Sequence, residues 1–464
     1  MVAATVAGCA SNQPLRVGAH QINAGVAADE PRAAVIGRDI LAQGGNAVDA
    51  ATAMGLAMGV TLPTRVGFGG GGVCVVHDAT SQRTRTLDFL PRPPAGVTSA
   101  ADKPAIAVPS MMRGLATLHA AHGKLRWEQL VAPVEAKARF DSQISRALAR
   151  DLQVFGDVAE GDAEARRVFL PDGPKPPTEG KKIDQPDLAA VLAQVRQRGA
   201  GAFYSGPLGS KIAEGVGISA STLSAYQAQW RDTADVQHGN DVMRFAATPE
   251  GAPAADALRA ALTASSGGRN AGLVKALEKV DPEGPPTAGL VAFDSFGQAV
   301  ACAFSIGAPM GTGKMIPGTG ILQAVATGAK GIGGPAIMVN PNINQPLFAG
   351  SAGLIGVGVA EEGAGAAPAA LVNVALRTLE QDMTAIDAVT APRLAPDPAG
   401  GTLIEETAEH PASRETTGVE GEIYGVQALG RVNLVSCKVN RSDGAKSCSA
   451  ATDPRGFGLA ASLQ

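Results

Sequence analysis

Residues 285–294 read Pro-Pro-Thr-Ala-Gly-Leu-Val-Ala-Phe-Asp, which places Thr287 at the head of an apolar run. That run ends at Asp-Ser-Phe-Gly, residues 294–297, a combination that favours a tight turn. A second, largely apolar run follows over residues 298–305. Two such runs joined by a short turn predict a β-hairpin, and Thr287 opens its first strand.

Thr287 can act as a catalytic nucleophile at this position only if the peptide bond before it is cleaved. A threonine hydroxyl is a weak nucleophile unless a base lies beside it, and the residue's own α-amino group can be that base. Residues 281–286, Asp-Pro-Glu-Gly-Pro-Pro, predict an extended linker, because proline excludes helix and disfavours central strands. We therefore predict a precursor that matures between Pro286 and Thr287. Taken alone, a threonine that opens a strand is more often a plain β-former.

The segment around Thr287 resembles the maturation site of γ-glutamyltransferases, in which a Pro-Gly-Thr/Ser-Gly-Ile-Leu run comes later; here that run is residues 317–322. Further stretches that resemble this family follow in its order along nearly the whole chain. They are residues 37–51 (GRDILAQGGNAVDAA), 67–72 (GFGGGG), 87–89 (LDF), 109–140, 201–206 (GAFYSG), 333–335 (GGP), 350–353 (GSAG), 391–393 (APR) and 453–455 (DPR). Their shared order, rather than any one motif, carries the resemblance.

The resemblance implies an α/β fold, a four-layer αββα sandwich of the N-terminal-nucleophile hydrolase type. It also implies that residues 23–286 form a large-subunit region and residues 287–464 a small-subunit region, the two associating after cleavage as one intertwined globule. The implied activity is that of a self-processing amidohydrolase or acyltransferase that acts on a small amide or peptide. This chemistry needs no cofactor, and we predict none.

The resemblance assigns a role to four residues around the hairpin. Thr287 is the nucleophile, and its freed amine is the general base. Ser305 stands where the family has a threonine whose hydroxyl bonds to the nucleophile. Two backbone N–H groups must face the developing oxyanion, and the matching pair is Gly353 and Leu354. Leucine tolerates a positive φ poorly, which makes Leu354 the weaker match of the two.

The substrate pocket is where the sequence departs from the family. Leu90 stands at the position of the arginine that holds the substrate α-carboxylate, and Arg92 is a candidate replacement two residues on, on the same face of an extended strand. Gly307 replaces an asparagine. The acid expected after residues 321–322 is missing, and residues 331–332 replace a pair of serines. A zwitterionic substrate needs both a cation and an anion, because unpaired charges are costly to desolvate.

Three functions remain open from these residues. The first is an amidohydrolase or acyltransferase whose acyl donor is not γ-glutamyl, and more apolar acyl groups suit the changes better. The second is a non-catalytic envelope binding protein or scaffold, favoured by the rigid pair Pro285-Pro286 before the predicted scissile bond. The third is true γ-glutamyl transfer with Arg92 repositioned.

Composition excludes several other classes of function. The net charge of −4, the pI of about 5.9 and the aromatic content of 4% give no basis for nucleic-acid binding. Residues 67–72 are not followed by the Lys-Ser/Thr of a phosphate-binding loop, and no Gly-x-Ser-x-Gly motif occurs. His119 and His122 share one helix face, but no further ligand is placed to complete a metal site, so we predict no metal.

The amino-terminal residues suggest a lipid anchor. Residues 6–10, Val-Ala-Gly-Cys-Ala, resemble a bacterial lipobox with Cys9 as the lipidated residue, and residues 1–22 would be a signal remnant and tether. Only eight residues precede Cys9. Either the sequence begins inside the signal peptide or the match is chance. The first alternative predicts a protein of the bacterial periplasm or cell envelope whose only membrane contact is the lipid.

The remaining four cysteines divide into two pairs. Cys74 and Cys302 lie in apolar runs and are predicted to be buried small hydrophobic residues. Cys437 and Cys448 flank a polar turn, and they either form a disulfide in an exported protein or remain two free thiols in a reducing compartment.

Overall fold

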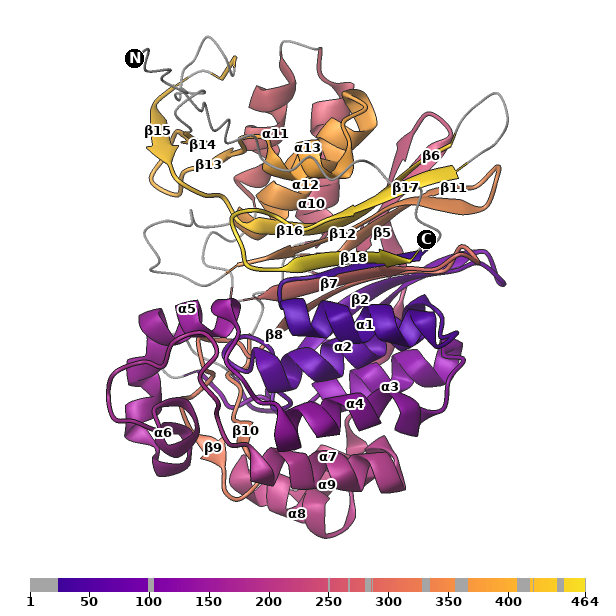
Figure 1. Cartoon of the computed structure of the whole chain (residues 1–464). Helices are drawn as coiled ribbons and strands as arrows, with labels where there is room; N and C mark the ends of the chain where they lie inside the picture. Colours follow the sequence, from indigo (N-terminus) through magenta and orange to yellow (C-terminus); the bar gives the residue numbers. More distant parts are fainter. Residues whose placement is uncertain are drawn as a thin grey trace, which may run out of the picture.

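Two β-sheets lie face to face, and a layer of helices covers each outer face (Figure 1). This computed structural model describes residues 24–98, 104–248, 251–265, 268–279, 285, 287–327, 334–354, 366–406, 418–419, 421–439 and 446–463. The arrangement confirms the predicted αββα sandwich.

The first sheet has seven antiparallel strands. Their order across the sheet is β18 (Leu459–Leu463), β1 (Ala24–Ala28), β7 (Ala288–Phe293), β8 (Ala299–Ser305), β2 (Gly71–Asp78), β3 (Arg83–Phe89) and β4 (Gln229–Arg231). The second sheet has six antiparallel strands, in the order β17 (Lys446–Ala451), β16 (Arg431–Val439), β12 (Gln345–Gly353), β11 (Ala336–Asn340), β6 (Asp241–Ala246) and β5 (Thr233–His238). Short strands outside them are β9 (Met315–Ile316), β10 (Ile321–Leu322), β13 (Leu394–Pro396), β14 (Thr402–Glu405) and β15 (Ile423–Val426).

The lower helical layer comes from the first half of the chain. It consists of α1 (Pro31–Ala42), α2 (Ala47–Thr61), α3 (Met111–His122), α4 (Trp127–Phe140), α5 (Arg146–Phe155), α6 (Ala163–Phe169), α7 (Pro186–Arg198), α8 (Gly206–Gly215), α9 (Ala220–Ala225) and the 3₁₀ turns η1 (Gly156–Gly161) and η2 (Ala200–Phe203). The upper layer consists of α10 (Gly251–Thr263), α11 (Arg269–Leu277), α12 (Ala366–Glu380) and α13 (Ala385–Thr390).

The predicted hairpin forms the centre of the first sheet as β7 and β8. Because successive side chains of a strand point to opposite faces, its residues alternate between two cores. Leu290 and Ala292 pack toward the lower helices, whereas Val291 and Phe293 pack between the sheets. The side chains of β8 that face the other sheet are Ala299, Ala301 and Ala303. The small size of these three residues lets the sheets approach closely.

Helix α2 is buried along its entire length, as expected of a helix that is apolar on all sides. Its amino end needs partners for its free N–H groups. Asn46 accepts from the amide of Asp49 at 2.9 Å. The hairpin turn supplies two more acceptors: Asp294 Oδ2 lies 2.9 Å from the amide of Ala47 and Gln298 Oε1 lies 3.1 Å from that of Val48. The turn that ends β7 therefore caps the buried helix.

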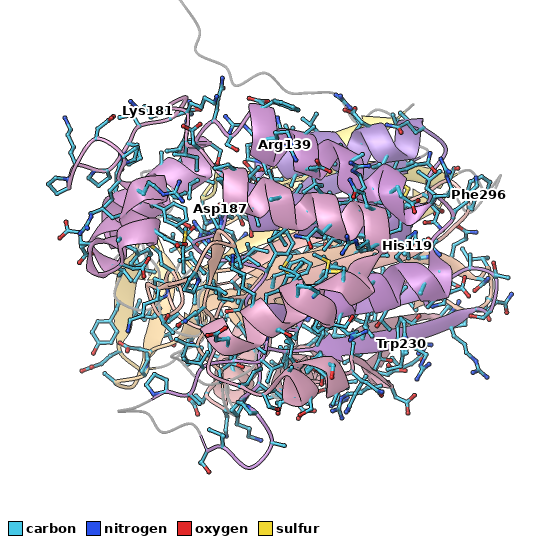
Figure 2. The ribbon with its side chains drawn as sticks, turned by 90° about the horizontal axis from the view of Figure 1, so that it is seen from below. His119, Arg139, Lys181, Asp187, Trp230 and Phe296 are labelled. Atoms are coloured by element: carbon cyan, nitrogen blue, oxygen red, sulfur yellow. A yellow bond between two sulfur atoms is a disulfide. The ribbon has the colours of Figure 1, made fainter. Side chains whose placement is uncertain are left out.

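The outer face of the lower helical layer is charged. Seen from below, Arg139 on α4 and Asp187 at the start of α7 lie on that face (Figure 2). Asp187 pairs with Arg167 at 2.9 Å, but both side chains are substantially exposed, so the pair contributes little to stability.

The residue pattern over 109–160 and 186–228 predicts mostly helix, and a further helix is predicted around residues 367–381; the structure confirms all three, the last as α12. The loop-forming residues within 231–286 predict an irregular segment around short helices. This prediction is wrong, because the segment also contains the hairpin of β5 and β6. In β5 only Val236 is buried, because the strand lies at the edge of its sheet, so the apolar alternation that identifies a strand is weak.

The described part of the chain contains two disulfides. Cys437 and Cys448 are opposite one another in β16 and β17 and are bonded, so they are not two free thiols. A loop of this length stabilises the folded state by about 3 kcal/mol. Cys74 in β2 and Cys302 in β8 are buried as predicted, but the prediction that they are simple hydrophobic residues is wrong, because they also form a disulfide. They are separated by 228 residues and meet only through strand pairing.

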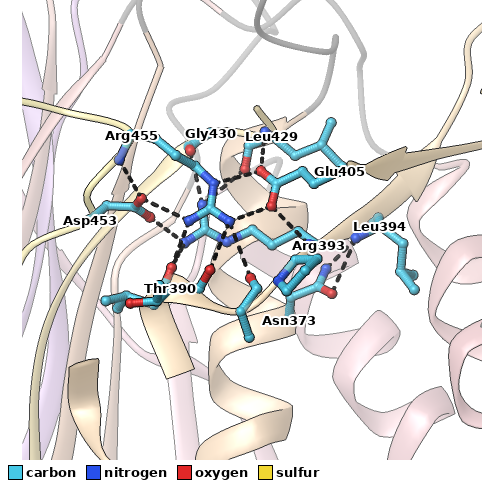
Figure 3. Close-up of polar contacts among 12 residues, drawn as sticks. Asn373, Thr390, Arg393, Leu394, Glu405, Leu429, Gly430, Asp453 and Arg455 are labelled. Atoms are coloured by element: carbon cyan, nitrogen blue, oxygen red, sulfur yellow. Dashed lines mark hydrogen bonds and ion pairs between the residues drawn. The ribbon is translucent and has the colours of Figure 1, made fainter. Parts of the chain in front are cut away.

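A buried ionic network explains two of the C-terminal motifs. Arg393 of the Ala-Pro-Arg motif pairs with Asp453 of the Asp-Pro-Arg motif, and Arg455 pairs with both Asp453 and Glu405 (Figure 3). The Arg393 guanidinium also donates to the carbonyl oxygens of Leu429, Gly430 and Val389. The network holds the chain at the point where it leaves β17 in one sheet for β18 in the other.

Asp453→Asn should lower the free energy of unfolding at pH 7 by about 3–5 kcal/mol, because it leaves buried Arg393 without its countercharge. Burial raises the pKa of Asp453, but the charges of Arg393 and Arg455 outweigh burial and hold that pKa below its ordinary value. The stabilisation is therefore present above the unfolded-state pKa of about 3.9 and is lost as the pH falls through the folded-state pKa.

Denaturant unfolding of parent and variant, measured between pH 7 and pH 3, checks both statements. Asp172→Asn is the control, because its pair with Lys181 is exposed. Equal losses of unfolding free energy in the two variants would contradict the assigned role of Asp453. The same holds if the difference in stability between parent and Asp453→Asn does not shrink as the pH falls.

Candidate active site

The first sheet brings Thr287 and Ser305 together. Ala288 is the partner of Phe304 in the β7–β8 pairing, so Thr287, immediately before β7, comes beside Ser305 at the end of β8. Thr287 is 1% exposed and Ser305 is fully buried. The Ser305 hydroxyl oxygen accepts from the amide of Gly307 at 2.9 Å. Two hydroxyl-bearing residues therefore lie side by side at one end of the central hairpin.

Thr287 also bridges the two sheets, through Leu354 at the end of β12. The amide of Thr287 donates to the carbonyl oxygen of Leu354 at 2.8 Å. In return, the Leu354 amide lies 3.1 Å from the Thr287 carbonyl oxygen and 3.0 Å from its Oγ1. The φ of Leu354 is not positive, so its leucine side chain imposes no backbone strain at this position. Of the two amides predicted for the oxyanion hole, Leu354 contacts the hydroxyl of Thr287.

Gly353 has no room for a side chain. A Cβ at this position would lie 2.3 Å from Asp29 Oδ2 and 3.3 Å from the Thr287 carbonyl oxygen. Asp29 is buried; it accepts from the amide of Gly289 at 2.7 Å and from Asn433 Nδ2 at 3.0 Å. Its carboxylate therefore joins β7 to β16 directly beneath Gly353. Asp29 is not among the residues predicted from the sequence, where its only signal is its place at the end of an apolar strand.

Comparison with known proteins finds one matching family model. Residues 33–260 match the model described as gamma-glutamyltranspeptidase. The chain is similar to this family over that region, which is just under half of its 464 residues. Human glutathione hydrolase 7 is 35% identical over 191 residues, which are 39% of this chain and 28% of that protein. The glutathione hydrolase proenzyme of Bacillus subtilis strain 168 is 33% identical over 207 residues, 41% of this chain and 35% of that protein.

The chain thus spans about a third of the length of these curated relatives. A crystal structure of cephalosporin acylase from Bacillus halodurans superposes with a TM-score of 0.80 at 20% identity, covering 99% of this chain and 100% of that one. At this level of identity the superposition shows a shared fold, and it extends beyond the region matched by the gamma-glutamyltranspeptidase model.

The arginine proposed as a replacement in the family pocket is already paired. Both outer nitrogens of Arg92 contact the carboxylate of Asp88, each at 2.8 Å, and Arg231 lies 2.8 Å from the same carboxylate. Burial raises the pKa of Asp88, but Arg92 and then Arg231 outweigh burial and hold it below its ordinary value. Asp88 is therefore ionised at neutral pH. Leu90, at the family arginine's position, is 3% exposed and belongs to the core between the sheets.

Two other positions that depart from the gamma-glutamyltranspeptidase pattern also make specific contacts with neighbouring residues. Gly307 has a φ of +83°, and a Cβ there would lie 1.8 Å from the carbonyl oxygen of Val325. An asparagine therefore cannot occupy this position without moving the backbone. Gln323, after β10, donates through Nε2 to the carbonyl oxygen of Gly215 and accepts from the Thr312 hydroxyl at 3.0 Å. Both polar atoms of its side-chain amide are therefore engaged in hydrogen bonds within the protein.

Several predicted positions lie outside the described residues. They are Cys9 with the rest of residues 1–22, Pro286, and residues 331–332. Among the described residues, no group of three or more His, Cys, Asp or Glu side chains is placed to hold a metal ion. His119 and His122 remain on α3, where His119 Nε2 lies 2.8 Å from the carbonyl oxygen of Leu125 (Figure 2 labels His119). In the part of the chain that the structure describes, no helix is long and apolar enough to cross a membrane.

Gly353→Ala should destabilise the protein by about 1–3 kcal/mol, because the added methyl group forces Asp29 and the Thr287 backbone apart. Thermal unfolding of the purified variant measures the loss. Gly201→Ala is the matched control, since a Cβ at Gly201 meets no atom within 4 Å. A Gly353→Ala variant as stable as this control would contradict the close contact described for Gly353.

Proposed function

We propose that the protein is a self-processing amidohydrolase or acyltransferase whose nucleophile is Thr287. The observation that carries the proposal is the contact between the Leu354 amide and Thr287 Oγ1, in a hydroxyl pair with Ser305. The match of residues 33–260 to the gamma-glutamyltranspeptidase model supports the same reaction class. The Bacillus subtilis relative is a glutathione hydrolase proenzyme, which supports maturation by cleavage.

In the first reaction the chain acts on itself. The Thr287 hydroxyl attacks the carbonyl carbon of residue 286, the peptide bond breaks, and the acyl group passes from nitrogen to oxygen as an ester. Water then hydrolyses the ester, which leaves a carboxylate on residue 286 and a free α-amine on Thr287. That amine is the base that takes the hydroxyl proton in each later turnover. The hydrogen bond from Thr287 to the Leu354 carbonyl oxygen supports a fixed position for this nitrogen.

In the second reaction the mature Thr287 attacks a substrate amide. The carbonyl oxygen becomes an oxyanion, which the amides of Gly353 and Leu354 stabilise by hydrogen bonds. The amine component leaves, and an acyl ester remains on Thr287. Water or a second amine then takes the acyl group. Ser305 positions the Thr287 hydroxyl through its own hydroxyl group, which explains why a serine can replace the family threonine.

The donor group that suits this pocket is more apolar than γ-glutamyl. Leu90 belongs to the core between the sheets, the side chain of Arg92 is held by the carboxylate of Asp88, and Gly307 cannot give way to asparagine without strain. A γ-glutamyl group carries an ammonium and a carboxylate. None of these three positions offers a free charge to either group. Unpaired buried charges are costly, so an uncharged acyl group is favoured.

The two disulfides support an oxidising compartment, because such bonds persist in exported proteins and are rare in the bacterial cytosol. This favours the periplasm or cell envelope and is independent of the lipobox at Cys9. It adds to the case for an exported protein.

Self-cleavage is checked by intact mass and a reducing, denaturing gel of the purified parent beside Thr287→Ala and Thr287→Ser. We expect two fragments in the parent that meet between residues 286 and 287. Thr287→Ala should remain a single chain, because no hydroxyl is left to attack, and Thr287→Ser should be cut more slowly. A single chain in the parent would refute the nucleophile and leave the non-catalytic binding or scaffold function.

Substrate class is checked with a panel of amides that share one chromogenic amine and differ in the acyl group. We expect kcat/KM for an apolar acyl group to exceed that for γ-glutamyl by at least about tenfold, the effect of one poorly paired polar group. Thr287→Ala controls for background hydrolysis. Preference for γ-glutamyl, lost in Arg92→Ala, would instead establish γ-glutamyl transfer through Arg92.

A further inference from the structure

We propose that the Cys74–Cys302 disulfide covalently joins the two fragments of the mature protein. This inference rests on the proposed cleavage before Thr287. Cys74 lies in β2, in the region that would become the large fragment, and Cys302 lies in β8, fifteen positions after Thr287, in the small fragment. Cleavage would therefore yield two polypeptides that remain one covalent molecule.

The order of strands shows where this bond acts. In the first sheet, β18, β7 and β8 come from the small-fragment region, whereas β1, β2, β3 and β4 come from the large-fragment region. The strands of the two regions are interleaved, and β8 next to β2 is one of their boundaries. Cys74 and Cys302 are direct partners in the pairing of these two strands. The disulfide is thus a cross-link at an interface between fragments rather than within one of them.

The bond also lies close to the candidate active site. Cys302 is three residues before Ser305, and its carbonyl oxygen accepts from the Ser351 hydroxyl at 2.6 Å. The same pairing that unites the cysteines sets Ser305 opposite Gly71. Slipping this pairing by one residue would turn every side chain of β8 to the wrong face. A covalent bond between opposite residues excludes that slip, so it preserves the position of Ser305 after the chain is cut.

Burial makes the bond durable. Both cysteines are 0% exposed and belong to the core between the first sheet and the lower helices. Thiol–disulfide exchange requires access to sulfur, so a reductant outside the folded protein cannot attack this bond. For the same reason the bond must form before the core closes. Each thiol loses one hydrogen, and the two electrons reduce a disulfide-bearing oxidant of the export compartment to its dithiol.

The second disulfide provides a matched control. Cys437 and Cys448 both lie in the small-fragment region, so their bond cannot join the fragments. Removing it deletes a disulfide of similar burial and cross-strand placement without removing the proposed link.

The test is a denaturing gel of purified protein, with free thiols alkylated at once in denaturant, run with and without reductant. We expect one band of full length without reductant and two with it. The double variant Cys74→Ala/Cys302→Ala should show two bands in both lanes. Cys437→Ala/Cys448→Ala should behave like the parent. Two bands from the parent without reductant would overturn the proposed link while leaving the proposed cleavage intact.

One band from the parent in both lanes would mean that the chain is not cut, which overturns the proposed function and with it the joined fragments. Peptide mapping of that uncut protein without reductant would still decide whether Cys74 and Cys302 are bonded, so the two failures are distinguishable. Both conclusions, on cleavage and on the disulfide, come from the parent protein alone, so neither depends on a variant that folds.

Refolding gives a second, independent measurement. Parent that has been cut, unfolded without reductant and diluted should regain its fold to the same extent at all protein concentrations, because its fragments cannot separate. The same protein unfolded with reductant, and with its thiols then blocked, should regain less as it is diluted. Equal dependence on concentration in the two samples would overturn the link.

Discussion

The capping of buried helix α2 by the hairpin turn is the interaction on which the site depends. Asp294 and Gln298 give the first amides of α2 their acceptors, and they do so from the turn between β7 and β8. A buried helix end without partners is costly, so the turn cannot shift along the helix without losing both bonds. Because strand register follows from the turn, this contact determines which residues of β7 and β8 reach the far end of the sheet together. Those residues are Thr287 and Ser305.

The candidate site is accordingly a meeting point of strands rather than a loop. Thr287 begins β7, Ser305 ends β8 and Leu354 follows β12 in the other sheet. Backbone hydrogen bonds in both directions hold Thr287 to Leu354 across the gap between sheets. Asp29 adds a second tie between the layers beside Gly353. A catalytic nucleophile must be positioned to within a fraction of an ångström, and residues held by such hydrogen bonds provide that rigidity.

The residues predicted to bind substrate depart further from the family pattern than those predicted to be catalytic. Thr287 and Ser305 both carry a hydroxyl group, and Gly353 and Leu354 each offer a backbone amide. The positions that would recognise a charged substrate instead serve the fold: Leu90 fills the core, Gly307 makes a close backbone contact, and Arg92 is held by Asp88. These three positions lie outside strands β7 and β8, which carry Thr287 and Ser305. The proposed change of acyl donor therefore requires no change in those strands.

The sequence by itself determined the hairpin, most of the helices and, through the order of its motifs, the sandwich fold; it also named the four residues of the candidate site, whose roles remain predictions. These features depend on periodicity, turn residues and motifs that each occupy a few neighbouring positions. Only the tertiary structure decided the Cys74–Cys302 bond, whose cysteines are 228 residues apart, and the contact of Asp29 with Asn433, 404 residues away. It also decided that Arg92 is paired and that β5 is a strand. Such contacts depend on sheet order and register, and no local pattern of residues encodes which distant strands become neighbours.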